Sequence, residues 1–374
     1  MAQETAPIGL VGPKRLVLIG GGHAHALVLR DWTPLPGVSL TLLNPAPSAP
    51  YSGMLPGLIA GHYARTALEI DLAGLARRTG ARLVEGRAEG IDRVARVIHV
   101  AGQEIPYDVA SVDIGITTGL PLPGFEAHGV AAKPLDTFVS AWEKFTAHTA
   151  AGLMAPEVAV IGAGVAGVEL ALAADFRLRT YGLTPRIALL EAATPLRDAP
   201  DPVRRALLAE LSRRDIALYP AAQTVTPDGV AVDGHAMIPA GFVLGVGGAR
   251  PQGWLRQTGL HLTDGFITVG AQLQSSDPAI FAAGDCAHLS HAPRPKAGVY
   301  AVRAAPVLRH NLRAALSGEP LHPYRPQTDY LKLISLGDRR ALAVRGRLWA
   351  RGALMWQWKD RIDRSFMAGF SARA

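Results

Sequence analysis

Two copies of one glycine-rich pattern, about 140 residues apart, constrain the fold of this chain more than any other feature. The first spans residues 16–25 (LVLIGGGHAH) and the second spans residues 158–170 (VAVIGAGVAGVEL). Each has a short apolar run, a glycine turn and an Ala- or Leu-rich segment, the order of a strand, a turn and a helix. In that context the glycines let the backbone approach a pyrophosphate, whose charge lies on the N–H groups that begin the helix. The two copies therefore predict two dinucleotide-binding units.

The whole pattern predicts an α/β fold with two Rossmann-like domains and a C-terminal α+β segment. The length of 374 residues suits two or three domains, and 49% apolar with 18% charged residues is a globular composition. We expect strands at 15–19, 38–43, 82–86, 96–100, 109–114, 242–246 and 267–269. We expect helices at 24–31, 137–152 and 298–317, and the second strand–helix–strand unit at 157–191.

Cysteine content and charge narrow the class of protein. Cys286 is the single cysteine, so an intrachain disulfide and a redox-active cysteine pair are excluded. Residues 1–5 lack a signal-peptide pattern and no apolar run reaches the roughly 20 residues of a membrane span, so we expect a cytoplasmic protein. The net charge is +7, and residues 338–364 carry eight Lys or Arg against three Asp. No nucleic-acid-binding motif accompanies these cations, so an anionic surface such as lipid headgroups is the favoured partner.

The residue that ends the second strand of each unit selects the nucleotide. An acid at this position binds the ribose hydroxyls. Glu191 occupies this position in the second unit, where its charge would repel a 2′-phosphate and so favour NADH over NADPH. The alternative is that Glu191 is a solvated carboxylate at the strand end, without a ligand. Asn44 occupies the position in the first unit and can bond a ribose without charge. His25 replaces the third glycine there, so it either widens the turn or lies near the ligand, and with His23 but no carboxylates it predicts no metal site.

These motifs resemble those of the pyridine nucleotide-disulfide oxidoreductase superfamily, flavoproteins with two dinucleotide-binding domains, over residues 14 to about 318. Residues 281–286 (FAAGDC) are similar to its second FAD signature, and residues 107–115 and 242–247 resemble the strands that close its two domains. The resemblance implies a discontinuous FAD domain at 14–120 and 255–318 and an inserted NAD(P)H domain at 130–254. It leaves a C-terminal region at 319–374, which would cap an acceptor site or face a membrane.

The resemblance also implies site residues. For FAD they are Gly20, Gly22, His23, His25, Asn44, Leu55, Pro56, Gly115, Gly284, Asp285 and Lys296. For NAD(P)H they are Gly162, Gly164, Gly167, Glu169, Glu191 and Gly247. Two are candidate catalytic residues. Lys296 would stabilise reduced flavin from the start of a helix, unless it is a surface lysine, and Glu169 would lie near the nicotinamide, unless it only complements the helix dipole.

Further details indicate a branch of the superfamily. Residues 167–171 (GVELA) and 51–57 (YSGMLPG) resemble the NADH dehydrogenase-like (type II) branch, and GGGHAH at 20–25 resembles its subgroup found fused to selenide, water dikinase. The family's Ala-Thr-Gly is replaced by residues 113–115 (DIG), and its quinone-site Gln pattern by residues 296–303.

We therefore expect an FAD-dependent NAD(P)H dehydrogenase that passes a hydride from NADH to FAD, and electrons to a quinone or other small acceptor. The alternative is a flavin-bound redox sensor or partner-binding module linked to selenium metabolism. A sulfide:quinone-type enzyme needs cysteines that carry sulfur, and one cysteine is too few.

A helical stripe marks the C-terminal region. Leu354, Trp358, Ile362, Phe366 and Phe370 recur at every fourth residue. Tryptophan beside basic residues is the composition of an interfacial helix, so we expect residues 346–374 to contact the inner face of a membrane. The alternative is that the stripe packs on the FAD domain or on a second subunit in a homodimer.

Overall fold

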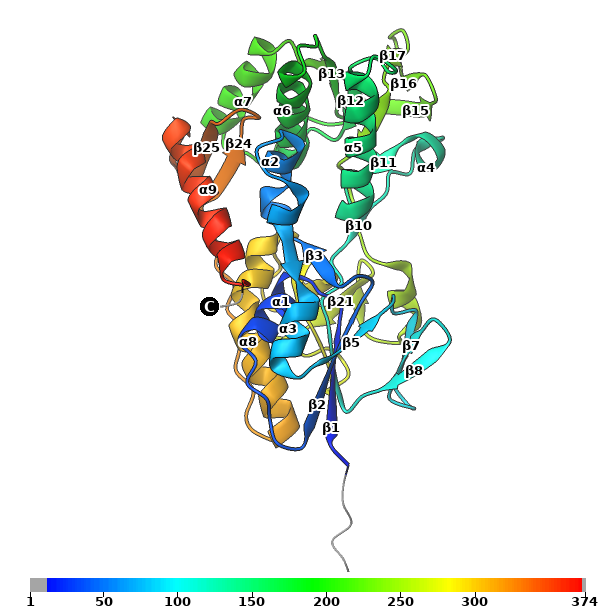
Figure 1. Ribbon diagram of the computed structural model, residues 1–374, viewed down its shortest axis with the longest axis vertical. Helices are drawn as coiled ribbons and strands as arrows, with labels where there is room; N and C mark the ends of the chain where they lie inside the picture. Colours follow the sequence, from blue (N-terminus) through cyan, green and yellow to red (C-terminus); the bar gives the residue numbers. More distant parts are fainter. Residues whose placement is uncertain (1–11, 372–374) are drawn as a thin grey trace, which may run out of the picture. The chain divides into compact units, whose positions relative to one another are not determined.

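The structure is a computed structural model that describes residues 12–371 (Figure 1). The expectation for residues 1–5 and the last three residues of the C-terminal region lie outside the described residues. The chain divides into two compact units. Unit 1 comprises Met1–Ser48, Asp71–Gly115 and Gly253–Pro326, and unit 2 comprises Ala49–Ile70, Ile116–Gln252 and Gln327–Ala374.

A five-stranded parallel sheet forms the centre of unit 1, in the order β22-β9-β1-β2-β5. Its strands are β1 (Lys14–Ile19), β2 (Val38–Asn44), β5 (Arg82–Glu85), β9 (Val109–Val112) and β22 (Ile280–Ala282). The last four residues of β1 and all of β9 are buried, as both faces of a parallel sheet must be. Helices α1 (His23–Arg30) and α8 (Gly298–Ser317) pack against each other, as Figure 1 shows.

The other elements of unit 1 are α3 (Leu72–Thr79) and two small sheets. One sheet is β6-β7-β8 (Gly90–Asp92, Val97–Val100, Gln103–Pro106), and the other is β20-β21-β23 (Leu262–Thr263, Phe266–Val269, Ala287–Leu289). Two 3-10 turns, η3 (Gly253–Gln257) and η4 (Gly284–Cys286), complete the unit. Asp71 caps α3 by accepting a 2.7 Å hydrogen bond from the Gly74 N–H, and Gly80 ends the helix in the left-handed region.

Unit 2 repeats the same strand–turn–helix order around a second parallel sheet, β11-β18-β12-β13-β14. Its strands are β11 (Val130–Ala131), β12 (Glu157–Ile161), β13 (Arg186–Leu190), β14 (Ala217–Tyr219) and β18 (Phe242–Gly245). The larger helices are α5 (Leu135–Ala150), α6 (Val165–Thr180) and α7 (Asp201–Arg213). A Cβ at Gly167 would collide with the carbonyl oxygen of Gly162, so only glycine lets α6 start this close to the turn.

Shorter elements make up the rest of unit 2 and the segments where the chain passes between the units. They are β3 (Ser48–Pro50), η1 (Ser52–Met54), α2 (Leu55–Ile59), η2 (Arg65–Leu68), β4 (Glu69–Asp71), β10 (Thr117–Thr118), α4 (Phe125–His128), β15 (Ala222–Thr226), β16 (Gly229–Val232), β17 (Ile238–Pro239) and β19 (Ala249–Arg250). Helix α2 packs against α6.

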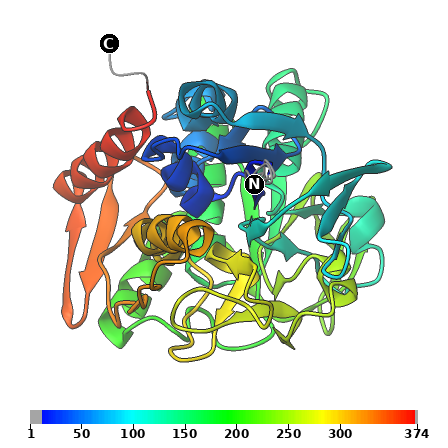
Figure 2. The same cartoon turned by 90° about the horizontal axis from the view of Figure 1, so that it is seen from below.

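The C-terminal part of unit 2 is a three-stranded antiparallel sheet with one helix. The sheet is β24-β25-β26 (Lys332–Ser335, Ala341–Arg345, Leu348–Gly352), and α9 (Ala353–Ala368) lies alongside it in Figures 1 and 2. This confirms the predicted α/β fold with its C-terminal α+β segment. Among residues 12–371, no helix combines the length and apolar character that a membrane crossing needs.

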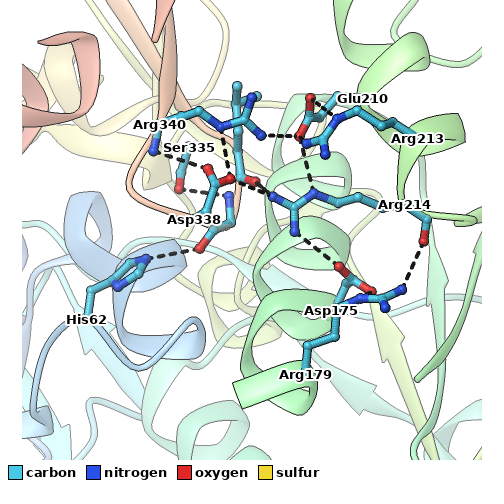
Figure 3. Close-up of polar contacts among 11 residues, drawn as sticks. His62, Asp175, Arg179, Glu210, Arg213, Arg214, Ser335, Asp338 and Arg340 are labelled. Carbon is cyan, nitrogen blue, oxygen red and sulfur yellow. Dashed lines mark hydrogen bonds and ion pairs between the residues drawn. The ribbon is translucent and has the colours of Figure 1, made fainter. Parts of the chain in front are cut away.

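A buried ion network fixes the β24–β25 turn to the helices of unit 2 (Figure 3). The Arg214 guanidinium lies 3.1 Å from Asp175 Oδ2, 3.2 Å from Glu210 Oε1 and 3.0 Å from Asp338 Oδ2. Arg340 adds a 2.7 Å contact to Glu210 Oε1. Because Asp175 and Glu210 are nearly inaccessible, these ion pairs offset the cost of burying their carboxylates.

Each of the seven predicted strands differs from the structure at one end, by one or two residues, and for two of them the backbone shows the reason. The strand expected at 96–100 begins at Val97, because Arg96 has a positive φ of 55° and belongs to the preceding turn. The strand expected at 109–114 ends at Val112, because Asp113 turns toward the first glycine loop.

Candidate cofactor sites

The first glycine turn has the backbone geometry of a pyrophosphate turn. Gly20 has a φ of +89°, and a Cβ there would lie 2.8 Å from the Ile114 side chain. Gly22 is the N-cap of α1, and His23 is the first residue of the helix. Gly115, also at a positive φ of 66°, follows β9 in the same unit. Glycine is therefore required where the chain turns most sharply.

In both units, the side chain at the end of the second strand accepts a hydrogen bond from the backbone of the glycine turn. In unit 1, Asn44 Oδ1 accepts a 2.8 Å hydrogen bond from the N–H of Gly21. In unit 2, Glu191 Oε2 accepts a 2.8 Å hydrogen bond from the N–H of Ala163, the equivalent turn residue, and Oε1 accepts one of 3.0 Å from Ala193. Both side chains thus hold the turn beside which a ribose would bind.

The His25 ring is held inside unit 1 by two hydrogen bonds, and its contact with FAD stays a prediction. The ring is completely buried, with Nδ1 2.7 Å from the Gly20 carbonyl oxygen and Nε2 2.8 Å from Ser111 Oγ. A carbonyl only accepts, so Nδ1 carries the proton and Nε2 accepts from the Ser111 hydroxyl. Burial lowers the pKa of His25 to about 4, so the ring is neutral. The side chain replaces the third glycine by reaching beneath the turn, toward β9.

Asp113 lies between the two segments expected to bind FAD. It is 2% exposed, and its Oδ2 accepts hydrogen bonds from the N–H groups of Ala24 (2.8 Å) and His25 (3.1 Å) in the first turn of α1. A Cβ at Gly22 or at Gly284 would collide with this carboxylate. One acidic side chain therefore contacts both the first glycine turn and the second signature.

The second signature forms a small cavity of about 30 Å³. Gly284, Asp285 and Lys296, all predicted to bind FAD, lie in its lining. Lys296 Nζ donates a 2.6 Å hydrogen bond to the Ala287 carbonyl and lies 3.8 Å from the centre of the Phe266 ring. Burial lowers the pKa of Lys296. The lysine is thus held in place by the fold, just before α8.

Cys286, next in the chain, is a packing residue. Its side chain is completely buried, and burial raises the pKa of the thiol to about 12. It therefore remains protonated at neutral pH and cannot act as a nucleophile.

A cavity of about 680 Å³ opens at the second glycine turn. The predicted NAD(P)H residues that line it are Gly162, Gly164, Glu191 and Gly247. Arg197 also lines it, on the loop that follows Glu191. The volume suits part of a dinucleotide, and the turn presents its backbone to the cavity.

Glu169 lies outside the lining of that cavity, on the second turn of α6. Its carboxylate accepts a 2.6 Å hydrogen bond from the N–H of Ser335 in β24. Burial raises its pKa to about 7, although nearby Lys359 and the Ser335 N–H oppose the shift. A carboxyl group with this pKa exchanges a proton at neutral pH.

Lys359 belongs to a second cluster within unit 2. Its Nζ donates to the Gly53 carbonyl (2.7 Å) and to Asp363 Oδ2 (2.6 Å), and the Tyr51 hydroxyl donates to Asp363 Oδ1 (3.2 Å). Burial raises the pKa of Asp363, and Lys359 opposes this. Together these contacts attach α9 to the loop at 51–57.

Leu55 and Pro56, predicted to lie against the flavin, begin α2 in unit 2. Both are buried, and α2 packs on α6. Their contact with FAD stays a prediction.

Sequence reasoning missed the contacts of Ser335, Lys359, Asp363 and Asp113 with the predicted site residues and their neighbours. Lys359 and Asp363 carry a signal, since an acid four residues after a lysine predicts an ion pair on one helix face. In the sequence, Asp113 stands out only because it replaces the first residue of the family's Ala-Thr-Gly. Ser335 acts through its backbone, so its side chain carries no signal. Within the described part of the chain, no group of His, Cys, Asp and Glu could hold a metal ion.

The fold and the two turns define an oxidoreductase with one dinucleotide site for FAD and one for NAD(P)H. Residues 14–305 match the model of the pyridine nucleotide-disulphide oxidoreductase family, and the chain belongs to this family. The residues present fit FAD, because the glycine turn offers backbone N–H groups to a pyrophosphate and the Asp285 carboxylate can accept from ribityl hydroxyls. The chain is accordingly an FAD-dependent NAD(P)H oxidoreductase of the NADH dehydrogenase-like branch, as the sequence predicted.

Individual proteins support this assignment. The NADH dehydrogenase-like protein YutJ of Bacillus subtilis is 24% identical over 368 residues, which cover 92% of this chain and 99% of YutJ. The demethylphylloquinone reductase NdbB of a Synechocystis species is 28% identical over 256 residues, or 65% of this chain and 61% of NdbB. The fold matches the structure of NDH2 from Plasmodium falciparum in complex with NADH, with a TM-score of 0.79, 12% identity and coverage of 96% and 97%.

Proposed function

We propose that this enzyme oxidises NADH and delivers the electrons to a quinone. The observation that carries the choice of NADH is the Glu191 carboxylate, which lines the cavity at the second glycine turn. A 2′-phosphate beside this acid would meet like charge, whereas a ribose hydroxyl can donate to it. A quinone acceptor is supported by the likeness to NdbB, which is named as a demethylphylloquinone reductase.

When bound, FAD supplies two-electron oxidation of the nicotinamide and one- or two-electron release to an acceptor. The chain supplies position and charge. Lys296 is a fixed cation within the cavity lined by Asp285, where it would favour negative charge on a ligand.

Glu169 is the candidate proton donor. Reduction of a quinone to a quinol consumes two electrons and two protons, so protons must reach the acceptor at neutral pH. A carboxyl group whose pKa is raised to about 7 can both hold and release a proton near neutral pH, which suits a general acid. The Ser335 N–H fixes one carboxylate oxygen, which leaves the other to take the proton.

Steady-state turnover with several acceptors tests the proposed function. NADH would be mixed with the holoenzyme and, in turn, a short-chain quinone, a one-electron dye or oxygen alone. We expect the quinone to be reduced fastest. If the FAD-loaded enzyme turns over no faster with the quinone than with oxygen, the proposal is overturned and the redox sensor is favoured. The link of such a sensor to selenium metabolism stays a prediction.

We further propose that the C-terminal region binds an anionic membrane surface. Large apolar side chains are exposed along β26 and α9: Leu348 (82%), Trp349 (41%), Leu354 (72%), Trp358 (46%) and Ile362 (41%). Three arginines are exposed beside them: Arg347 in the turn before β26, Arg351 in β26 and Arg361 in α9. Apolar side chains beside cations match the acyl chains and headgroups of an anionic bilayer.

The predicted stripe divides into two parts. Phe370 is 4% exposed, and Phe366 packs 4.5 Å from the Tyr51 ring, so these two residues belong to the packing of unit 2. Leu354, Trp358 and Ile362 keep their exposed positions. Point variants are therefore a sharper test than deletion of residues 346–374, which would also remove the buried Asp363.

Cosedimentation with vesicles that contain anionic lipid tests this contact. The variant carrying L354E and W358E should lose vesicle binding, and a variant carrying V94E, another exposed apolar residue, should retain it. Equal recovery of all three proteins in the supernatant at low salt would rule out the membrane role. If the apolar face instead joins two copies of the chain, the double variant will change the mass measured by light scattering.

A further inference from the structure

The two glycine turns differ in whether a side chain accepts hydrogen bonds from the first N–H groups of the helix that follows. In unit 2, within the described residues, no side chain bonds the N–H groups of Val165, Ala166 or Gly167, and the turn opens into the cavity. In unit 1, Asp113 already bonds the N–H groups of Ala24 and His25. One turn is therefore open to a ligand, whereas the other carries an anion from its own chain.

We propose that Asp113 is an internal anion that competes with the pyrophosphate of FAD and so sets the affinity for this cofactor. The positions it bonds are the second and third of α1, which an N-cap side chain normally satisfies. Gly22 has no such side chain, and a Cβ at this position would collide with the Asp113 carboxylate. Asp113 supplies the missing cap from the end of β9.

The backbone of Asp113 holds the carboxylate in this place. Its N–H donates a 2.8 Å hydrogen bond to the Ile19 carbonyl, and its carbonyl accepts a 3.1 Å hydrogen bond from Gly22. The carboxylate lies against both Gly22 and Gly284, the glycines of the two FAD signatures. The competitor is thus fixed at the point where these signatures meet.

Two consequences follow from the position of this charge. A helix N-terminus stabilises one anion, and a second anion in a nearly inaccessible site is repelled by the first. FAD consequently binds less tightly than the glycine turn alone would allow. The same carboxylate caps α1 in the absence of FAD, so it stabilises the apoprotein and makes the cofactor exchangeable.

The test compares wild type, D113N and D113A as apoproteins. Asn keeps an acceptor oxygen without the charge, and Ala removes both. FAD affinity is measured by quenching of flavin fluorescence, and calorimetry measures binding of ADP, which has the pyrophosphate without the flavin. Adenosine, which has no phosphate, is the ligand control. D108N is the matched variant, because Asp108 precedes β9 and pairs with Arg15 at the opposite end of the sheet.

We expect D113N to bind FAD and ADP about tenfold more tightly than wild type, or ~1.4 kcal/mol, with adenosine unchanged. We expect apo D113A to unfold about 2–4 °C lower, as loss of a cap predicts. D108N should keep the wild-type FAD affinity. Unchanged or weaker binding of FAD by D113N would overturn the proposal, and weaker binding would make Asp113 a ligand of FAD. If D113A fails to fold, D113N alone decides. NADH binding, measured in parallel, keeps this result separate from the proposed function.

Discussion

Glu169 in α6 accepts a 2.6 Å hydrogen bond from the backbone N–H of Ser335 in β24. This contact joins the helix that begins at the second glycine turn to the C-terminal sheet. Since burial raises the pKa of Glu169 to about 7, its protonation state changes within the physiological range. The contact therefore makes a residue of the nucleotide domain sensitive to how the C-terminal sheet is placed.

Replacing Glu169 with Gln tests its proposed role as proton donor. Gln can still accept from the Ser335 N–H but does not titrate. In wild type, the protonated form is lost as pH rises through about 7, so quinone reduction should slow over that interval. E169Q should be slower by about 10²-fold at pH 6 and should lack this pH dependence. Steady-state rates of quinone reduction between pH 6 and 8 measure the effect, and E89Q, a change at an exposed glutamate, is the control. A wild-type pH profile in E169Q would contradict the role of Glu169 as proton donor.

Replacing Glu191 with Gln should shift the choice of coenzyme. Gln can still accept from the Ala163 N–H, so the turn is retained while the negative charge is removed. The ratio of kcat/KM for NADPH over NADH should rise about tenfold, the equivalent of ~1.4 kcal/mol. Flavin reduction followed in a stopped-flow instrument gives both rates. Equal use of the two coenzymes by wild type would show that Glu191 does not act on the ribose.

Replacing Asp285 with Ala should remove most of the bound FAD. Asp285 occupies the position whose acid, by resemblance, binds the ribityl chain, and it lines the cavity with Gly284 and Lys296. The measurement is the ratio of flavin to protein absorbance after purification. E104A, which changes an exposed acid of the same unit, should keep wild-type occupancy. Full occupancy in D285A would exclude Asp285 from the FAD site.

Replacing Arg214 with Met should destabilise the protein strongly. The change leaves Asp175 and Glu210, 1% and 3% exposed, without their main buried cation. Breaking a buried ion pair costs about 3–5 kcal/mol, and denaturant-induced unfolding measures the loss. R213A is the control, since the Arg213 side chain is 55% exposed and its loss should cost under about 1 kcal/mol. Equal midpoints for the two variants would contradict the importance of the network.

The repeated elements could be predicted because their signals are local. Each glycine turn follows directly on an apolar strand, and this combination is rare outside dinucleotide-binding units. The helix predicted at 298–317 has the same bounds as α8. The stripe that begins at Leu354 likewise predicted α9, since an i+4 repeat is a local property of helices.

The site could be predicted only where a single segment builds it. Asn44 and Glu191 follow from their place at a strand end. The partners of Glu169 and of the α1 N-terminus are Ser335 and Asp113, which lie 166 and 89 residues away in the chain. His25 also bonds Ser111, 86 residues away, so its orientation depends on β9 rather than on its own turn. No local pattern specifies these contacts.

In the proposed function, NADH reduces the bound flavin and a quinone reoxidises it. The most direct measurement is anaerobic rapid mixing of the holoenzyme with NADH, followed by a second mixing with a short-chain quinone, while flavin absorbance is recorded. We predict fast bleaching with NADH, slower bleaching with NADPH, and full recovery of absorbance with the quinone. Flavin that stays oxidised with NADH, or that stays reduced with the quinone, would contradict the account.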